Sequence, residues 1–423
     1  MKTVMPTPQT MPLARWIIVA FGFFALSLSF SGRAALGLVM PVWQAEFGWS
    51  SSYISGVGAS ALIVMALVAP VAGRLVDRKG PRFTLNLGMG LLGIGCAIVA
   101  AMTNKIAFVV GFSGFCAVGF GIVATHVVAT AVTRAFTTRQ GLATGIATSG
   151  ATGGQFLIIP LIAGLLTMAS WRWSFAALAL LSLALIPCIR ISVRANGYGH
   201  TANRQDRPSS VTSDLFSIIK RPAFHILFWS FLICGFTTTG VIETHLLPYA
   251  SYCGFPPLLS ASAYGLLSLV NLAGMIAVGW LTDRMHRPTL LAMIYLVRAL
   301  TFILLANLPG LPIEWLFVFA LFFGIVDYST VPVTASLVAS HVGLRVMGLA
   351  MGLISAGHAI GGAAGAYLGG LIFDSSGGYH LLWMASIWLA GAAGISVLFL
   401  NGCKPHDAAC ADVRVGTASD VSQ

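Results

Sequence analysis

The feature that most constrains this chain is a series of long apolar runs separated by short polar segments. The twelve runs span residues 14–38, 53–75, 83–102, 106–133, 141–167, 171–190, 223–250, 260–282, 288–306, 313–338, 346–373 and 379–400. A helix of about 20 apolar residues crosses a hydrocarbon core of about 30 Å, and a helix satisfies its own backbone hydrogen bonds inside lipid. The sequence therefore predicts an all-α membrane protein with twelve transmembrane helices.

Charged residues are too scarce to cover a water-soluble surface. Asp, Glu, Lys and Arg make up 8% of the 423 residues and apolar residues 57%, whereas a soluble domain carries about 25% charged residues. This composition excludes a soluble enzyme, a nucleic-acid-binding domain and a disordered tail protein, although the formal net charge is +11. The seven cysteines contain no C-x-x-C pair, so we expect no metal site and no cofactor.

The longest polar segment inside the chain separates two sets of six runs. We therefore predict an N-terminal six-helix bundle over 1–190, a linker over 191–222, a C-terminal six-helix bundle over 223–400 and a tail over 401–423. Lys and Arg concentrate in the linker and in alternate connections between runs, and such residues mark the cytoplasmic side. The linker and both termini are accordingly expected in the cytoplasm, with a multi-pass chain in the cytoplasmic (inner) membrane.

The two sets of runs repeat each other. The segment from Gly73 to Arg78 matches the segment from Gly279 to Arg284, 206 residues later, and Gly141 to Gly145 matches Gly348 to Gly352, 207 residues later. Two matches at nearly one offset indicate a parallel duplication, with both halves inserted in the same orientation. Glycines at three- to five-residue spacing in the fifth and eleventh runs predict closely packed helices.

The stretch Gly73-x-x-x-Asp77-Arg78-x-Gly80-x-Arg82 resembles the loop signature of the major facilitator superfamily. Arg139 to Gly145 with Ser149-Gly150, Ser31-Gly32-Arg33 and Gly361 to Asp374 resemble its monocarboxylate branch and the bacterial oxalate/formate relatives. The resemblance implies two pseudo-symmetric six-helix bundles, in the major facilitator fold, that alternate access to a small molecule. We expect the chain to work as a monomer.

One departure from the branch bears on the substrate. The branch commonly carries an Asp and an Arg four residues apart in the eighth helix, and its Arg is thought to bind the substrate carboxylate. The matching positions here, counted back from Gly279, are Asn271 and Met275. The carboxylate clamp is therefore absent, and Asn271 remains as a candidate substrate contact.

Four ionisable residues are strong candidates because they lie well inside the apolar runs, where a charge costs several kcal/mol and its default interpretation is functional. Arg298 lies halfway along the ninth run, and it either contacts substrate or pairs with Asp327 in the tenth run. Arg33 lies near the outer end of the first run, where the resemblance implies a cation on the pore side; an outward-reaching anchor is the alternative. Asp327 and Glu243 are candidate proton carriers.

Histidines add candidates of a second kind. Residues two apart on a helix point about 200° away from each other, so Glu243 and His245 cannot both face a pore. We predict that His245 and Tyr249 line the pore beside Pro248, and that Glu243 is a lid carboxylate near the outer mouth. His126 and His358 lie at mid-membrane depth, and each either packs with a hydrogen bond or titrates near neutral pH as a candidate proton carrier. His358 is also a candidate substrate contact, since the resemblance implies a cationic substrate residue in its helix.

The two repeated loops predict an inner gate. Asp77-Arg78 and Asp283-Arg284 lie at the ends of the second and eighth runs. Their basic members set topology, whereas Asp contributes little to orientation. The resemblance implies that the acids pair with cytoplasmic arginines, of which Arg134 and Arg345 are the candidates.

The chain is expected to be a secondary transporter and not an enzyme, since it has no ATP-binding loop, nucleophile elbow or catalytic dyad. The candidate cations predict a small organic anion, monocarboxylate-like, as substrate, and the titratable residues predict proton coupling. Two alternatives stay open: uptake or efflux of a larger amphipathic molecule such as a vitamin or drug, and a transporter-like receptor. Besides substrate and proton, the only expected partner is the lipid bilayer, with no nucleic acid.

Overall fold

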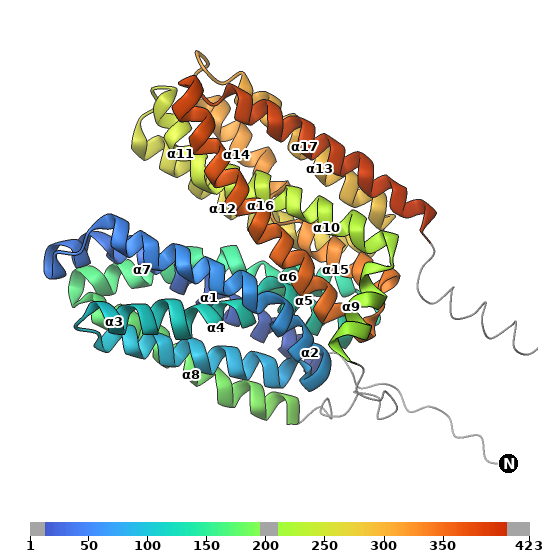
Figure 1. The fold of residues 1–423 in the computed structure, drawn as a ribbon, viewed down its shortest axis with the longest axis horizontal. Helices are drawn as coiled ribbons and strands as arrows, with labels where there is room; N and C mark the ends of the chain where they lie inside the picture. Colours follow the sequence, from blue (N-terminus) through green and yellow to red (C-terminus); the bar gives the residue numbers. More distant parts are fainter. Residues whose placement is uncertain (1–12, 195–209, 404–423) are drawn as a thin grey trace, which may run out of the picture.

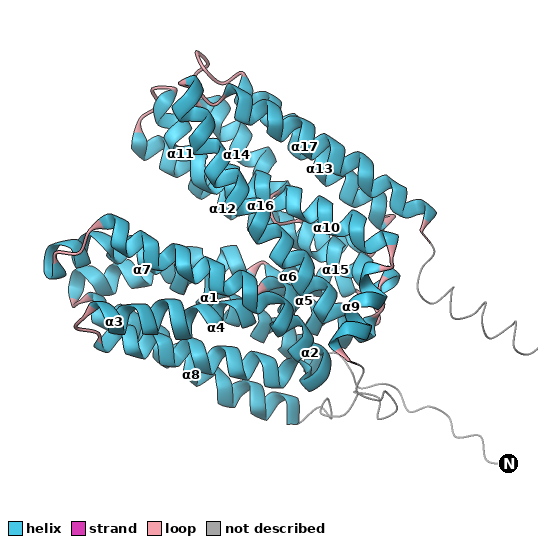
Figure 2. Cartoon of the chain, in the orientation of Figure 1, coloured by secondary structure: helices cyan, strands magenta, loops and turns pink. Residues whose placement is uncertain are grey.

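The structure is a computed structural model that describes residues 13–194 and 210–403, and every regular element in these residues is a helix (Figure 2). The predicted all-α fold is confirmed over this part of the chain. The two ends of the chain and residues 195–209, which hold most of the predicted linker and tail, lie outside the described residues.

The first half of the chain supplies the helices α1 to α8. They are α1 (Leu13–Phe47), α2 (Ser51–Ala101), α3 (Lys105–Phe108), the π-helical η1 (Val109–Cys116), α4 (Ala117–Ile122), α5 (Thr125–Ala135), α6 (Gln140–Thr148), α7 (Gly150–Met168) and α8 (Trp171–Arg194). The second and third predicted runs both lie in α2, which consists of two helices joined by a kink at Gly80. Gly80 has φ 78° and ψ 166°, a conformation that glycine adopts without a steric penalty.

The second half supplies α9 to α17. They are α9 (Val211–Ile219), α10 (Pro222–Gly235), the π-helical η2 (Phe236–Ile242), α11 (Glu243–Tyr252), α12 (Pro257–Thr282), α13 (Arg287–Ala306), α14 (Glu314–Val326), α15 (Thr330–His341), the 3-10 turn η3 (Leu344–Val346), α16 (Met347–Ser376), α17 (His380–Leu398) and the 3-10 turn η4 (Phe399–Gly402). Over the described residues, nine helical spans are long and apolar enough to cross a membrane. The total of twelve spans stays a prediction.

The helices α1 to α8 lie together in one group, and α10 to α17 lie in a second group (Figure 1). The two groups touch through glycines from the repeated motifs. A Cβ atom on Gly73 would lie 2.0 Å from the carbonyl oxygen of Gly348, and one on Gly141 would lie 2.3 Å from that of Gly279. These contacts lie at the end of the molecule that holds α9, which we call the linker end.

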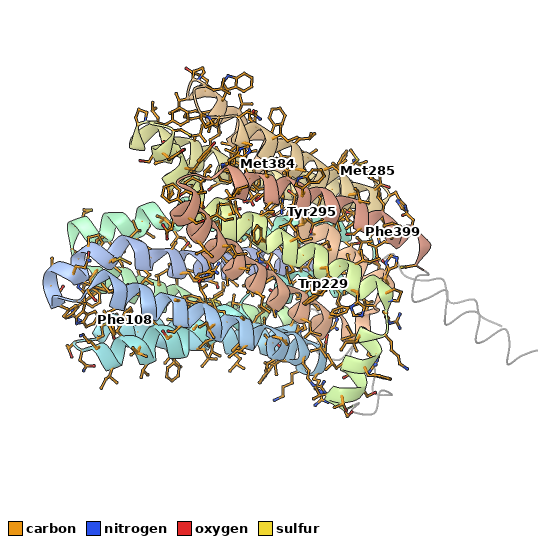
Figure 3. The ribbon with its side chains drawn as sticks, turned by 45° about the horizontal axis from the view of Figure 1, so that its top comes forward. Phe108, Trp229, Met285, Tyr295, Met384 and Phe399 are labelled. Carbon is orange, nitrogen blue, oxygen red and sulfur yellow. The ribbon has the colours of Figure 1, made fainter. Side chains whose placement is uncertain are left out.

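The outer surface is apolar, and a few charged side chains are buried beside an apolar core. Trp229 and Phe399, labelled in Figure 3, are 58% and 69% exposed. Arg298 is 0% exposed and Asp327 5%. Large exposed apolar side chains suit contact with lipid tails, and buried charges in such a protein must find partners inside it.

Close packing within the second group generates a test of the fold. A Cβ atom on Gly361 would lie 2.0 Å from the Leu232 carbonyl oxygen, whereas one on Gly370 of the same helix would meet nothing within 4 Å. We expect Gly361→Ala to lower the free energy of unfolding by about 1–3 kcal/mol, as overpacking does. Gly370→Ala should leave it unchanged or raise it by up to about 1 kcal/mol, because Ala favours helix.

Thermal unfolding of the purified variants in detergent checks this expectation. Equal melting temperatures for the two variants would show that α16 does not approach α10 as closely as described.

Candidate functional site

Arg298 binds the main chain at a break between two helices. Helix α14 ends at Val326 and α15 begins at Thr330, so the last carbonyls of α14 have no partners within the helix. The Nη2 group of Arg298 donates to the carbonyl oxygen of Val326 at 2.7 Å and to that of Asp327. A cation at a helix C-terminus is also favoured by the helix dipole, so Arg298 caps α14.

The other end of the Arg298 guanidinium is held by α10 and η2. Its Nη1 group donates to the Cys234 Sγ at 3.0 Å and the Thr237 Oγ1 at 3.3 Å. The His358 side chain of α16 lies within hydrogen-bonding reach of the same thiol. Arg298 therefore ties three separate parts of the second group together.

The carboxylate of Asp327 does not pair with Arg298. Its Oδ2 accepts a hydrogen bond from the Asn271 Nδ2 at 3.0 Å, and its buried Oδ1 has no hydrogen-bond partner. One of the two interpretations left open for Arg298 was an ion pair with the Asp327 side chain. Arg298 instead donates to the main-chain carbonyl of Asp327. Asn271, predicted as a substrate contact, holds Asp327 in place.

Arg33 makes no hydrogen bond or ion pair with any of the described residues. Its guanidinium lies 3.9 Å from the centre of the Phe30 ring, and its buried Nε has no hydrogen-bond acceptor. The Glu243 carboxylate and the neutral Tyr328 phenol, both in the second group of helices, lie close enough to interact electrostatically with it. Arg33 therefore faces acidic groups across the boundary between the two halves.

Glu243 is exposed, and Tyr328 positions it. The Tyr328 Oη donates to the Glu243 Oε1 at 2.7 Å, and the Tyr328 N–H donates to the Asn271 Oδ1 at 3.4 Å. The structure thus brings together Arg33, Glu243 and Asp327 from the predicted set and adds Tyr328. One signal in the sequence pointed to Tyr328, its position directly after a buried acid.

Two predicted pore residues lie elsewhere. His245 is buried, and its Nε2 is 3.0 Å from the Ala366 carbonyl oxygen. Tyr249 is 2% exposed and donates to the Leu305 carbonyl at 2.6 Å. Both pack in an aromatic cluster with Tyr379. In this structure both side chains are therefore satisfied inside the second group, by aromatic neighbours and main-chain carbonyls, and a role of His245 and Tyr249 in lining the pore stays a prediction.

The remaining two histidines are also separated. His126 on α5 is 2% exposed, with its Nε2 3.2 Å from the Ala69 carbonyl oxygen and its Nδ1 without a partner. His358 is half-buried against Phe231, with the ring centres 5.1 Å apart.

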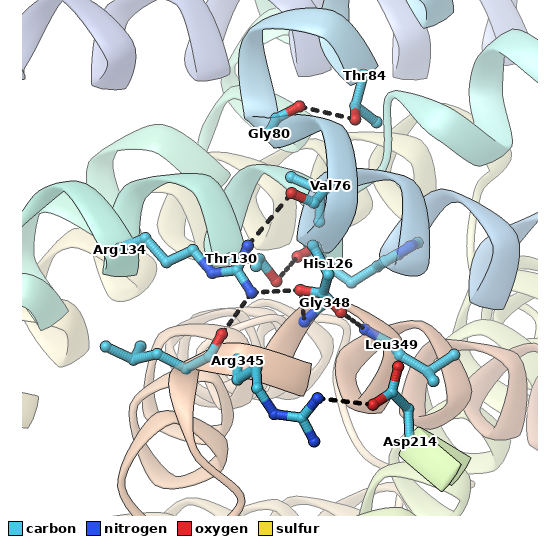
Figure 4. A network of polar contacts seen from close by, with 12 residues as sticks. Val76, Gly80, Thr84, His126, Thr130, Arg134, Asp214, Arg345, Gly348 and Leu349 are labelled. Carbon is cyan, nitrogen blue, oxygen red and sulfur yellow. Dashed lines mark hydrogen bonds and ion pairs between the residues drawn. The ribbon is translucent and has the colours of Figure 1, made fainter. Parts of the chain in front are cut away.

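A second polar network joins the two halves at the linker end (Figure 4). The Asp77 carboxylate accepts from the backbone N–H groups of Gly348 at 2.8 Å and Leu349 at 2.7 Å, at the start of α16. Arg134 pairs with the same carboxylate and also donates to the Val76 and Leu344 carbonyls. The expected pairing of Asp77 with Arg134 is present, and it is completed by a helix N-terminus that favours negative charge.

The repeat-related acid makes the reciprocal contact. Asp283 accepts from the N–H groups of Gly141 at 2.8 Å and Leu142 at 2.9 Å, at the start of α6. Each half thus places an acid on a helix N-terminus of the other half. These N–H groups were not predicted. The acids belong to the loop motif that repeats after 206 residues, and the N–H groups belong to the glycine motif that repeats after 207 residues.

The other predicted gate arginines contact different groups. Arg345 donates to Asp214 of α9 at 2.9 Å, and Arg74 lies 3.4 Å from the same carboxylate. Arg284 stacks on the Trp280 ring at 3.6 Å, and Arg78 is exposed. Asp214 is an addition to the predicted network, and it contacts an arginine from each half.

Two related helical halves, apolar outside and with charged groups between them, define a polytopic membrane transport protein. The model of the Major Facilitator Superfamily matches residues 22–348. The chain belongs to this superfamily, as the repeated loop motif predicted.

Known proteins of similar length agree with this assignment. The chain is 26% identical to the uncharacterized MFS-type transporter YcxA of Bacillus subtilis, over 94% of this chain and 98% of YcxA. It is 25% identical to monocarboxylate transporter 13 of Rattus norvegicus, over 96% and 92%. The E. coli fucose:proton symporter FucP has the same fold, with a TM-score of 0.75, 15% identity and coverage of 92% and 98%.

The contacts of Arg298 predict that its role depends on its shape as well as its charge. A lysine cannot reach both the α14 carbonyls and the Cys234–Thr237 side. We expect Arg298→Lys and Arg298→Ala to insert into the membrane but to unfold more readily, at about 1–3 kcal/mol for each buried group left unpaired, and to lose transport.

Thermal unfolding measures the loss of stability, and uptake into vesicles measures the loss of transport. Arg284→Lys is the matched control, because Arg284 is exposed and stacks at the surface. An Arg298→Ala variant with the stability of the natural protein would contradict the capping role.

Proposed function

We propose that the chain is a secondary active transporter that moves a small monocarboxylate-like anion together with a proton by alternating access. The observation that carries the proposal is Arg33, whose guanidinium has no hydrogen-bond or ion-pair partner among the described residues and faces Glu243 and Tyr328 across the boundary between the halves. An unpaired cation at membrane depth is costly, and a bound anion removes that cost.

The charges of the site favour coupling to a proton. When Glu243 and Asp327 are both ionised they balance Arg33 and Arg298, and the empty site then has no formal net charge. A monoanion alone would add an uncompensated charge inside a medium of low dielectric constant, which is unfavourable. A proton taken up with the anion restores neutrality, and Glu243 and Asp327 are the carboxylates able to accept it.

The relatives support the chemical class. Monocarboxylate transporter 13 and FucP are named for a monocarboxylate and for a proton-coupled sugar, respectively. Met275, which stands where the monocarboxylate branch carries its arginine, lies at the tight contact between α12 and α6, where a Cβ atom on Gly145 would be 2.4 Å from its carbonyl oxygen. Arg33 is therefore the residue proposed to bind the substrate carboxylate.

The described state is proposed to be closed toward the cytoplasm. The linker end carries the basic loops, which mark the cytoplasmic side, and there the halves are joined by Asp77, Asp283 and Asp214. Glu243, by contrast, is exposed. We assign twelve spans in two bundles of six, with the termini in the cytoplasm, and a cycle in which these three acids release their partners as the halves rock.

Uptake of the substrate should depend on a proton gradient. In liposomes that contain the purified protein, a monocarboxylate should accumulate when the outside is made acidic, without sodium and without substrate inside. One pH unit is worth about 1.4 kcal/mol per proton, which supports about tenfold accumulation. Accumulation that ignores the gradient and needs preloaded vesicles would establish exchange and exclude proton coupling.

Removing the Asp77 charge should change gating and spare binding. Asp77→Asn loses the ion pair with Arg134 and weakens both bonds to α16, while the site around Arg33 is untouched. We expect a changed transport rate and faster exposure of the cytoplasmic face to a thiol reagent, with an affinity within about twofold of the natural one.

Asp374→Asn, an exposed acid at the other end of α16, is the control and should change neither quantity. A large loss of affinity in Asp77→Asn at an unaltered rate of conformational exchange would contradict the gate assignment.

A further inference from the structure

Tyr328 occupies the centre of the polar groups that lie between the halves. It follows the end of α14, and its side chain is half-buried. Its single phenolic hydrogen is donated to the Glu243 Oε1 at 2.7 Å, and its backbone N–H is donated to the Asn271 Oδ1 at 3.4 Å. The phenol is therefore anchored through its backbone and bonded to an acid on a different helix.

The charged and titratable groups around this hydroxyl come from several elements. Glu243 of α11, Asp327 beside it in sequence and Arg33 of α1 act on the Tyr328 phenol. Tyr264 of α12 lies in the field of the same two acids. Arg298 is occupied by the α14 carbonyls and the Cys234–Thr237 side. Arg33 is thus the cation left to hold an anion next to Tyr328.

We propose that the Tyr328 hydroxyl couples proton binding to anion binding, because it has one hydrogen and two acceptors that compete for it. This inference rests on the proposed function and assigns Tyr328 as a substrate-contacting residue. With Glu243 ionised, the hydrogen is held by Glu243. With Glu243 protonated, it is free to bind the substrate carboxylate that Arg33 holds.

The step balances without any further reactant. A proton from outside water adds to the Glu243 carboxylate, and the resulting carboxylic O–H donates to a lone pair of the Tyr328 oxygen. The phenol O–H rotates and donates to the substrate carboxylate. No covalent bond to the substrate forms, and the anion gains a charge-assisted hydrogen bond only after the proton has bound.

Affinity for the anion must then be higher when Glu243 is protonated than when it is ionised, and by linkage the anion must favour protonation of Glu243 to the same degree. The affinity of a coupled pair changes by at most tenfold for each pH unit. A tyrosine with only a structural role would change stability and leave this pH profile unchanged.

The test measures dissociation constants of the purified full chain for acetate, L-lactate, pyruvate and benzoate between about pH 4 and about pH 8, a range that reaches the ordinary titration range of carboxyl groups. The natural protein should bind one or more of them more tightly at acidic pH. Tyr328→Phe, which removes only the hydroxyl, should bind more weakly at acidic pH and show less than a twofold change over the range. Glu243→Gln should bind with an affinity near that of the acidic natural protein at every pH, because its amide donates to the Tyr328 oxygen as the carboxylic acid does.

Tyr367→Phe is the matched control, since Tyr367 is 71% exposed, and it should keep the natural pH profile. A Tyr328→Phe variant with the natural pH dependence overturns the coupling role and leaves the proposed function standing. Should Tyr328→Phe fail to fold, a Glu243→Gln variant that retains the natural pH dependence overturns it instead. If the natural protein binds none of the four acids, both the proposed function and this inference are refuted.

Discussion

A charged side chain at membrane depth has to find its partners inside the protein, and Arg298 shows how this chain meets that constraint. The carbonyls it binds are free only because α14 stops at Val326 and α15 starts at Thr330. The break and the arginine therefore require each other: without the break the guanidinium has too few acceptors, and without the guanidinium the carbonyls are unpaired in a dry interior. The same break fixes the positions of Asp327 and Tyr328, so the polar groups between the halves depend on this one cap.

The contact between the halves is built from the repeated motifs and has a physical basis in glycine and helix ends. Gly73 and Gly141 let the backbones approach Gly348 and Gly279, respectively, with no room for a side chain. This approach brings the N–H groups at the starts of α16 and α6 within reach of the acids that follow Gly73 and Gly279 in the repeated loops. Carboxylates on helix N-termini are favoured by the dipole, and these hydrogen bonds are part-buried, except for the exposed bond from Leu142 to Asp283. Such a contact is firm and reversible, as a moving interface requires.

The sequence predicted the helical class, the duplication and the Asp77–Arg134 pair, because apolar length, a constant offset and a familiar loop motif are all visible in one dimension. It did not predict the partners of Arg298, since free main-chain carbonyls depend on where a helix breaks. His245 and Glu243 were assigned to opposite faces correctly, but the choice of which face meets the other half rested on Pro248, which marks an irregular helix without giving its direction. Tyr328 was missed because a tyrosine in an apolar run ordinarily packs; only the position of Glu243 in space gives it a role.

Under the proposed function, the membrane itself enforces coupling. The empty site contains two cations and two carboxylates and is neutral, and the site with anion and proton together is neutral again. A site with only one of the two ligands carries a net charge that must be moved through a region of low dielectric constant. Arg33 belongs to one half, and Glu243 and Tyr328 belong to the other. Every rocking step therefore moves Arg33 relative to Glu243 and Tyr328. Coupled transport therefore needs no separate sensor of the proton. The electrostatic cost of a site that holds only one of the two ligands, together with the single hydrogen of the Tyr328 hydroxyl, is sufficient.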